Sequence, residues 1–328
     1  MTQGLFTPEE VSDMILAGDN LLLAGDAKLL SQLPAGNWIG GSTTFFILYP
    51  ENKTTSNEKI FVNQLPRFVT DVDIKEYDET SVKTIFNNGR QNSFTVLIMP
   101  WFTPIAVEYS LNSPYYEKFA LHPVCGWLAG LSLENQTDKS YVLSGWAPGV
   151  LSEKGIAMQV MLPKDKYVDI NIFNAYKQGN GDSIVFDYSS LTLTYAIING
   201  KKRNLAQYLR EVEHKSLFPL VANYSGAMIN ITILNVGETE VTVSAPVFQG
   251  VDYRLAVAND EIAEPELISD KIILSVTCVG NYIQSDICRK YFNKMNGPAV
   301  FGEIAYQQLG MSTVYVTVDD ILLNSDTK

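Results

Sequence analysis

One carboxylate stands among apolar residues near the end of the chain, in the segment Val-Phe-Gly-Glu-Ile-Ala-Tyr at 300–306. A carboxylate is costly to bury unless a partner compensates its charge. Gly302 beside it leaves room for the close approach of a backbone or a ligand. Glu303 is therefore predicted either to form a structural ion pair with Arg254 or Arg289, or to hold the ammonium or hydroxyl group of a ligand at a pocket.

A second reactive group, Cys278, ends an apolar strand and is followed by Val-Gly-Asn, which places its thiol and Asn281 at the mouth of the predicted pocket. A position ahead of a helix lowers the pKa of a thiol, so Cys278 is a candidate nucleophile. Nucleophilic catalysis needs a neighbouring base, and the sequence places no histidine beside Cys278. A small apolar cysteine packed within its strand is the competing interpretation.

The two histidines, His122 and His214, are far apart and have no second ligand at helical spacing. The spacing of Cys278 and Cys288 matches no zinc motif. No metal site and no cofactor are therefore predicted. Either histidine could serve as an axial ligand of haem, which is the alternative cofactor. A partly exposed loop histidine is the competing interpretation of His122.

A glycine-rich run, Gly40-Gly41-Ser42-Thr43, has the composition of a phosphate-binding loop, but no lysine follows it and its glycines fall within an apolar strand. Nucleotide binding is therefore not predicted, and the run is expected to line the ligand pocket instead. The remaining residues predicted to line this pocket lie on or beside apolar strands and are Cys125, Trp127, Asn223, Cys278, Asn281, Gly302, Glu303 and Tyr306.

Three segments, which begin at residues 21, 94 and 271, share one predicted order of strand, helix, breaker and a second, glycine-marked strand. In the first segment this second strand is predicted over 37–46, interrupted by the pair Gly40-Gly41. Gly40, Gly126 and Gly302 align in the middle of the three second strands. Internal duplication or the general similarity of βαβ units explains the pattern, and both predict sheets with helices on their faces.

Between the second and third segments, short apolar and alternating runs joined by Gly, Asn and Asp turns predict a strand-rich region. It includes a helix at 204–212 and a hairpin that pairs 226–235 with 240–247. At the start of the chain, Thr7-Pro8-Glu9-Glu10 predicts a capped helix that runs to about residue 17.

Length and composition indicate a folded protein with two lobes. The chain has 328 residues, of which 46% are hydrophobic and 18% charged, and this length is large for a single core. The predicted fold is α/β (α+β), with mixed β-sheets flanked by helices. An N-terminal α/β lobe is predicted at 1–150 and a C-terminal strand-rich α/β lobe at 151–328.

The charge balance is acidic, with 24 Lys and Arg against 36 Asp and Glu and a net charge of −12. Nucleic acids and anionic membranes are recognised by clustered cations, so neither is a predicted partner. The N-terminus lacks the basic and apolar regions of a signal peptide, no apolar run reaches the length of a membrane span, and three cysteines are too few for a disulfide framework. A cytoplasmic location is predicted.

Several motifs resemble known families. Cys278-x-Gly280, followed by Phe301-Gly302-Glu303-Ile304, resembles the C-terminal part of FIST sensory domains, and Ser225-Gly226-Ala227 and Gly40-Gly41-Ser42-Thr43 are similar to two further motifs of that family. Leu-Pro-x-Gly-x-Trp-Ile-Gly-Gly at 33–41 and Gly-Pro-x-x-Phe-Gly-Glu-Ile-Ala-Tyr at 297–306 resemble an uncharacterised bacterial family of stand-alone proteins. This second resemblance covers nearly the whole chain.

The FIST resemblance implies a two-part α/β fold and a bacterial signal-input module for a small, amino-acid-like ligand, with haem-binding nitric oxide sensors among the relatives. Asn281 stands where FIST domains usually have Arg, and the His-Asn pair expected after the Gly-Glu-Ile strand is missing from 307–313. Because both losses remove groups that would hold an anionic or metal-bound ligand, the identity of the ligand does not transfer.

The sequence thus predicts a cytoplasmic, FIST-like protein that binds a small ligand without catalysis and acts through a separate signalling partner. A homodimer is compatible with this prediction. Two alternatives stay open: a haem-binding nitric oxide sensor with His122 or His214 as the axial ligand, and a thiol-dependent enzyme that uses Cys278.

Overall fold

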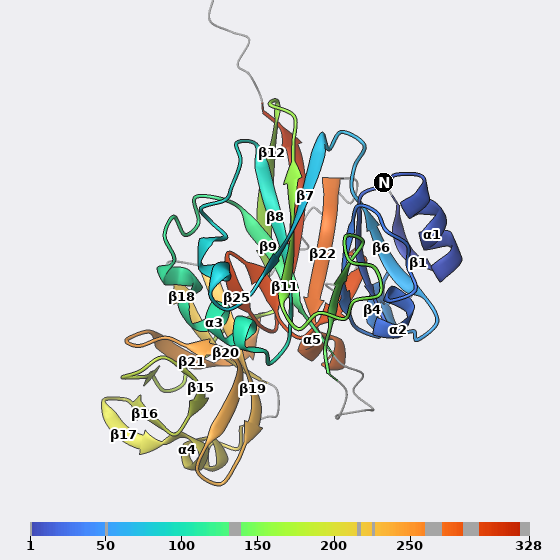
Figure 1. The fold of residues 1–328 in the computed structure, drawn as a ribbon. Helices are drawn as coiled ribbons and strands as arrows, with labels where there is room; N and C mark the ends of the chain where they lie inside the picture. Colours follow the sequence, from blue (N-terminus) through green and yellow to red (C-terminus); the bar gives the residue numbers. More distant parts are fainter. Residues whose placement is uncertain are drawn as a thin grey trace, which may run out of the picture.

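The computed structural model describes residues 2–49, 52–130, 139–214, 218–224, 227–259, 271–284 and 295–321. In these ranges the protein is mixed α/β, as predicted, with several mixed sheets and a few helices (Figure 1). The acidic segment at 260–268, the Ser225-Gly226 motif and most of the helix expected after Asn281 lie outside the described residues.

Three sheets form the larger part of the fold. In spatial order, the strands of the first sheet are β1 (Gln3–Phe6), β6 (Ile60–Gln64), β2 (Leu21–Gly25), β3 (Trp38–Ser42) and β10 (Val142–Ser144). Those of the second are β7 (Asp71–Tyr77), β11 (Gly155–Met161), β8 (Ser93–Pro100), β9 (Val124–Ala129), β24 (Glu303–Ala305) and β25 (Gln307–Leu309). Those of the third are β12 (Lys166–Phe173), β26 (Thr313–Asp320), β22 (Ile272–Cys278), β23 (Gly297–Val300), β4 (Phe45–Leu48) and β5 (Asn52–Thr55).

Each of these sheets contains one parallel strand pair, and the three pairs are the predicted βαβ units. β2 pairs with β3, β8 with β9, and β22 with β23, all in parallel. The helices that follow β2, β8 and β22 are α2 (Ala27–Leu30), α3 (Pro104–Asn112) and α5 (Val279–Ile283). The prediction of three βαβ segments is confirmed.

The strand after each parallel pair leaves its own unit and closes the sheet of another. β4 pairs antiparallel with β23, β10 with β3, and β24 with β9. The next long strand of each unit returns to its own sheet, where β6 pairs with β2, β11 with β8, and β26 with β22. Because the same connections recur in cyclic order, the topology favours internal duplication over a general similarity of βαβ units.

The inner faces of the three sheets share one hydrophobic core. Leu22 and Ile39 come from the first sheet, Val96 and Trp127 from the second, and the third contributes residues that include Val276. The parallel pairs of the first and second sheets also bury a second face under helices and loops, and the third sheet packs Ile47 and Cys278 against the inserted region that contains Val221. The parallel strands are accordingly apolar along their whole length, as strands covered on both sides must be.

Two details of the predicted units are wrong. The strand predicted over 37–46 is two strands, because the chain turns at Thr43-Thr44 and passes from the first sheet into the third. Gly302 does not lie in the middle of a strand but between β23 and β24, where the chain crosses from the third sheet into the second. In both cases apolar residues stand on both sides of the junction, because each side of it is buried in a different sheet.

Helices α1 and α4 begin where the sequence predicts. Helix α1 (Pro8–Leu16) has the complete capping box, in which Glu10 N–H donates to Thr7 Oγ1 at 3.3 Å and Thr7 N–H donates to Glu10 Oε2 at 2.8 Å. Helix α4 (Leu205–Glu211) is capped by the side chain of Asn204. The remaining short helices are η1 (Ser81–Thr84) and η2 (Ser113–Tyr115).

A fourth sheet, curled into a half-barrel, is inserted between β12 and β22 and lies at the lower left of Figure 1. It contains the predicted hairpin as β19 and β20 and packs α4 against its inner face. Its strands are β13 (Tyr176–Gln178), β14 (Ile184–Val185), β15 (Ser190–Leu193), β16 (Tyr195–Ile198), β17 (Lys201–Asn204), β18 (Pro219–Tyr224), β19 (Ala227–Val236), β20 (Val241–Val247) and β21 (Asp252–Ala258).

Strands from both sides of residue 150 pair with each other in the second and third sheets: β11 pairs with β8, β24 with β9, and β23 with β4. Division of the chain into lobes at 1–150 and 151–328 stays a prediction about folding units.

Gly126 is required by the close contact between β8 and β9. Its φ is +142°, and a Cβ at this position would lie 1.9 Å from the carbonyl oxygen of Leu97. Gly126→Ala should lower the free energy of unfolding by about 2 kcal/mol or more, because backbone cannot yield as a flexible side chain does. Chemical denaturation measures the loss.

Gly181→Ala is the matched control, since a Cβ there would meet no atom within 4 Å. It should be neutral or slightly stabilising. Equal stability of the two variants would contradict the tight packing at Gly126.

Candidate functional site

Glu303, predicted to form an ion pair or to hold a ligand, is fully buried at the start of β24, where it pairs with Trp127 of β9. Its Oε1 accepts two hydrogen bonds from Ser312, at 2.8 Å from the backbone N–H and at 2.6 Å from the hydroxyl. The thiol of Cys278 adjoins the same carboxyl group. The structure therefore brings Glu303, Cys278 and Trp127 together. Asn281, which follows Cys278 closely in the sequence, is buried in α5.

No cation compensates Glu303 among the described residues. Arg254 lies 3.9 Å from Asp252 instead, so it is not the partner, and Arg289 lies outside the described residues. Burial raises the pKa of Glu303 to about 7 because the charged form loses its hydration, and the hydrogen bonds from Ser312 oppose the shift. Its Oε2 has no hydrogen-bond partner in this part of the chain. The carboxyl group is thus poised to hold a proton near neutral pH.

Burial also raises the pKa of the Cys278 thiol, and the neighbouring Glu303 charge adds to the increase. Since the thiolate is the nucleophile, a thiol kept protonated reacts slowly. Cys278 packs with apolar residues of β4 and the half-barrel, among them Ile47 and Val221. This geometry agrees with the competing interpretation of a small apolar cysteine.

The place of Glu303 in the repeated topology makes its charge unusual. β10 and β4 hold the same position beside β3 and β23 that β24 holds beside β9. These strands begin with Val142-Leu143 and Phe45-Phe46, which are buried hydrocarbon. A carboxyl group therefore occupies a position that the fold fills elsewhere with apolar side chains, and its retention there costs stability.

The glycine-serine-threonine run lies where the ends of β3, β9 and β23 meet. Ser42 Oγ donates to the carbonyl of Gly130 at 2.7 Å, and Thr43 Oγ1 donates to the carbonyl of Ala299 at 2.8 Å. A Cβ on Gly41 would lie 2.8 Å from Nε1 of Trp127. In the structure these residues join the three sheets, and Gly40 packs on β2.

The other predicted lining residues are spread out. Cys125 is buried in β9 and directs its thiol to the carbonyl of Thr95 at 3.7 Å. Tyr306 has a φ of +62°, and its carbonyl accepts a hydrogen bond from Tyr109 at 2.7 Å. Asn223 is exposed on β18 of the half-barrel. These three side chains therefore do not join the group at Glu303.

His122 is buried, and its expected exposure in a loop is wrong. Its Nε2 lies 2.8 Å from Thr95 Oγ1, and its ring packs so closely on Gly89 that a Cβ there would come within 2.3 Å. Burial lowers its pKa to about 4, so the ring is neutral at pH 7. Burial also lowers the pKa of His214, and a hydrogen bond with the backbone of Phe218 opposes this shift. The role of either histidine as a haem ligand stays a prediction.

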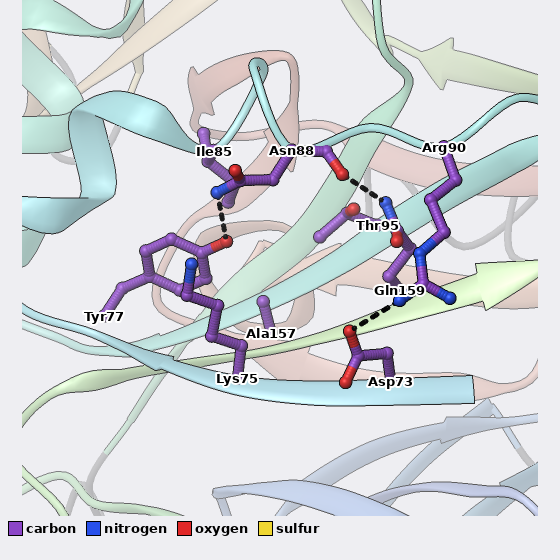
Figure 2. Close-up of a pocket in the computed structure, with 9 residues that line it drawn as sticks. All are labelled: Asp73, Lys75, Tyr77, Ile85, Asn88, Arg90, Thr95, Ala157 and Gln159. Carbon is purple, nitrogen blue, oxygen red and sulfur yellow. Dashed lines mark hydrogen bonds and ion pairs between the residues drawn. The ribbon is translucent and has the colours of Figure 1, made fainter.

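A pocket that the sequence analysis did not predict lies on the outer face of the second sheet (Figure 2). Its volume is about 240 Å³. The residues that line it come from β7, β8, β11 and the loop after η1, and they are Asp73, Lys75, Tyr77, Ile85, Asn88, Arg90, Thr95, Ala157 and Gln159.

Strand alternation and loop hydrogen bonds position these side chains. Alternate residues of β7 point to one face of the sheet, and on this face Lys75 stands opposite Ala157 and Asp73 opposite Gln159. Gln159 Nε2 donates to the carbonyl of Asn88 at 3.0 Å, and Asn88 Nδ2 donates to the hydroxyl of Tyr77 at 3.3 Å (Figure 2). The loop is thereby tied to two strands of the sheet.

The pocket carries two cations and one carboxylate. Lys75 Nζ lies 5.0 Å from the centroid of the Tyr77 ring, and Arg90 Nη2 lies 3.4 Å from Asp73 Oδ2. Burial raises the pKa of Tyr77, so its hydroxyl stays a neutral hydrogen-bond group. The floor is Thr95, whose hydroxyl is engaged with His122. This set of groups suits a small polar ligand with at least one negative charge.

One sequence signal pointed to part of this pocket. The run Asp-Val-Asp-Ile-Lys-Glu-Tyr at 71–77 alternates polar and apolar residues, which is typical of a strand with one solvated face. Nothing in the sequence places Asn88 and Arg90 over that face, because the loop is held there by Gln159, some seventy residues further along the chain.

The chain belongs to DUF6976, described as a family of unknown function, whose model matches residues 6–319. No curated protein and no solved structure matches it. Within the described residues, no helix is long and apolar enough to cross a membrane, and no group of three or more His, Cys, Asp or Glu side chains could hold a metal ion.

Glu303→Gln should remove a pH dependence of stability. The folded-state pKa of about 7 lies above the usual value of 4.5, so between these values the native state holds a proton that the unfolded chain has lost. The wild type should therefore lose stability as the pH rises from 4.5 to 7. Gln stays neutral, so above pH 7 the variant should be more stable than the wild type by about 3 kcal/mol.

Urea denaturation of both proteins at pH 5 and pH 8 measures the effect. The difference between the two proteins in how the free energy of unfolding changes with pH isolates the contribution of Glu303, because His122 titrates in both. Glu153→Gln, at an exposed acid paired with Lys139, is the control and should follow the wild type. Parallel pH profiles for wild type and Glu303→Gln would show that Glu303 is ionised like an exposed acid.

Proposed function

We propose that the protein binds a small carboxylate-bearing molecule of the amino-acid class in the pocket of Figure 2, without catalysing a reaction. The observation that carries this proposal is the meeting of Lys75 and Arg90 at one pocket in a chain with a net charge of −12. Cations that converge in a strongly acidic protein create a local attraction for anions that its overall charge opposes.

The lining groups match the two ends of an amino acid. Lys75 and Arg90 can donate charge-assisted hydrogen bonds to a carboxylate, and Asp73 can accept from an ammonium group. Tyr77 and Gln159 supply neutral polar contacts. The volume of about 240 Å³ lies below the range of about 300–1,000 Å³ that holds drug-sized ligands, so the ligand is small.

Arg90 is available for a ligand. Its ion pair with Asp73 is 3.4 Å long, and both side chains are 55% exposed. Exposed pairs of this kind contribute about 0–1 kcal/mol, because water screens the charges and two side chains must be held still. A ligand carboxylate can therefore replace Asp73 as the partner of Arg90 at little cost.

A sensory role follows from the resemblance to FIST domains, and it requires a separate partner that responds to the bound state. The loop from η1 to Arg90 is the element that a ligand would hold more firmly, since it contributes Asn88 and Arg90 and is tied to the sheet by side-chain hydrogen bonds. We place the signal in this loop. The cytoplasmic location belongs to the same proposal.

A second candidate binding position is the buried group at Glu303. Its support is that Oε2 of Glu303 and Oδ1 of Asn281 have no hydrogen-bond partner within the described residues. Buried acceptors of this kind are completed by a water molecule, a proton or a ligand. A haem at His122 or His214 and a reaction at Cys278 have no comparable observation in their favour and stay predictions.

The test is calorimetric titration of the full chain with the twenty amino acids and with short mono- and dicarboxylates. Lys75→Gln and Arg90→Gln should each weaken the binding of the ligand so identified by roughly tenfold or more, because each removes a hydrogen bond to a charged group. The affinity should also fall as the salt concentration rises.

Lys202→Gln is the matched control. Like Lys75, Lys202 lies over a tyrosine ring, and like Arg90 it pairs with an acid, but it belongs to the half-barrel. It should bind like the wild type. If the ligand still binds to both pocket variants, it does not bind in this pocket. Loss of ligand binding at neutral pH in Glu303→Gln would then favour the buried position.

A further inference from the structure

A second pocket, with the opposite chemical character, lies on the other face of β7. Its volume is about 280 Å³, and most of its walls are hydrocarbon or aromatic. The lining residues are Ile74, Glu76, Ser144, Trp146, Ala147, Val150, Ser152 and Ile156.

The two pockets share one ribbon of two strands. Along β7, Asp73, Lys75 and Tyr77 line the pocket of Figure 2, whereas Ile74 and Glu76 line the second pocket. The alternation of side chains across a strand puts these two sets on opposite faces. β11 divides in the same way, with Ala157 and Gln159 on one face and Ile156 on the other.

The loop that forms the outer wall is anchored at both ends. Gly145 N–H donates to the carbonyl of Trp38 at 2.9 Å, and Ser152 bridges to Val142 through backbone hydrogen bonds of 2.9 and 3.1 Å. The loop runs along the outer edge of β10. In the other two sheets the corresponding edges, those of β24 and β4, are paired with β25 and β5. Its exposed side chains are therefore presented from a fixed support.

This wall exposes large apolar side chains to solvent. Trp146 is 73% exposed, and Val150 and Leu151 are also exposed. Exposed apolar side chains that lie together beside a cavity often mark a binding site. The face of an indole ring in addition attracts a cation, because the ring carries negative charge on its face.

A carboxylate stands at the edge of this apolar pocket. Glu76 accepts hydrogen bonds from Ser152 Oγ at 3.1 Å and from Lys154 Nζ at 2.8 Å. Lys154 is largely exposed, so a ligand cation can take its place. The acidic charge of the whole chain favours cations over anions at such a position.

We propose that this pocket is a second ligand site, which binds a small apolar amine. The ammonium group lies between the carboxylate of Glu76 and the ring of Trp146, and the hydrocarbon part packs on Ile74, Val150 and Ile156. The site is independent of the proposed amino-acid pocket, since the two have no side chain in common.

Intrinsic fluorescence tests the proposal, because the chain has four tryptophans and Trp38 and Trp127 are fully buried. Titration of the full chain with 2-phenylethylamine should give a saturable change in emission, as the ligand covers Trp146. The neutral analogue 2-phenylethanol should bind at least tenfold more weakly. Equal binding of amine and alcohol would overturn recognition of the charge, and the absence of saturable binding of the amine up to millimolar concentration would overturn the site.

Variants then assign the contact by calorimetry. Glu76→Gln and Trp146→Ala should each weaken binding of the amine tenfold or more, with thermal unfolding showing that each variant is folded. Glu153→Gln, at a neighbouring acid that does not line the pocket, and Lys75→Gln should bind the amine like the wild type. Unchanged affinity in Glu76→Gln or Trp146→Ala, or an equal loss in Glu153→Gln, would refute the proposal, and neither result bears on the amino-acid pocket.

Discussion

The open edge of each parallel strand pair is closed by a strand from another unit, and the rest of the structure depends on this exchange. β3, β9 and β23 would each present unpaired N–H and C=O groups if β10, β24 and β4 were absent. Such groups are costly to leave unsatisfied when the edge is buried. No unit can complete its own sheet, so the three sheets and their shared core must form together.

The exchange also explains how a carboxyl group comes to be buried. β24 is the strand that closes the second sheet, and it places Glu303 against Trp127 of another unit. The turn that carries Ser312 holds this carboxyl group, and the neighbouring Met311 carbonyl accepts a hydrogen bond from Asn230 of the half-barrel at 2.9 Å. Glu303 is thus linked through one turn to the inserted sheet.

The ribbon of β7 and β11 is the part of the fold that offers binding surface on both faces. The parallel strands are buried on both sides, whereas β7 is an edge strand on which exposed and half-buried residues alternate over most of its length. Its alternation of polar and apolar residues gives one charged pocket and one apolar pocket, separated by the thickness of a single sheet. A ligand on either face therefore contacts the same two strands.

Features that depend on neighbouring residues were determined by the sequence alone: the capping box at Thr7, the βαβ units that begin near residues 21, 94 and 271, and the hairpin of β19 and β20. The grouping of Glu303 with Cys278 was also anticipated as two walls of one site. Its full burial was not, because burial depends on what covers a strand.

Only the tertiary structure decided where the strands exchange between sheets and where the charged pocket lies. The turn at Thr43 is held by Ala299, and the pocket loop is held by the bond between Asn88 and Gln159. Partners so distant in the chain leave no local pattern of hydrophobicity or turn residues. Their contacts arise when three units that cannot close their own sheets pack around one core.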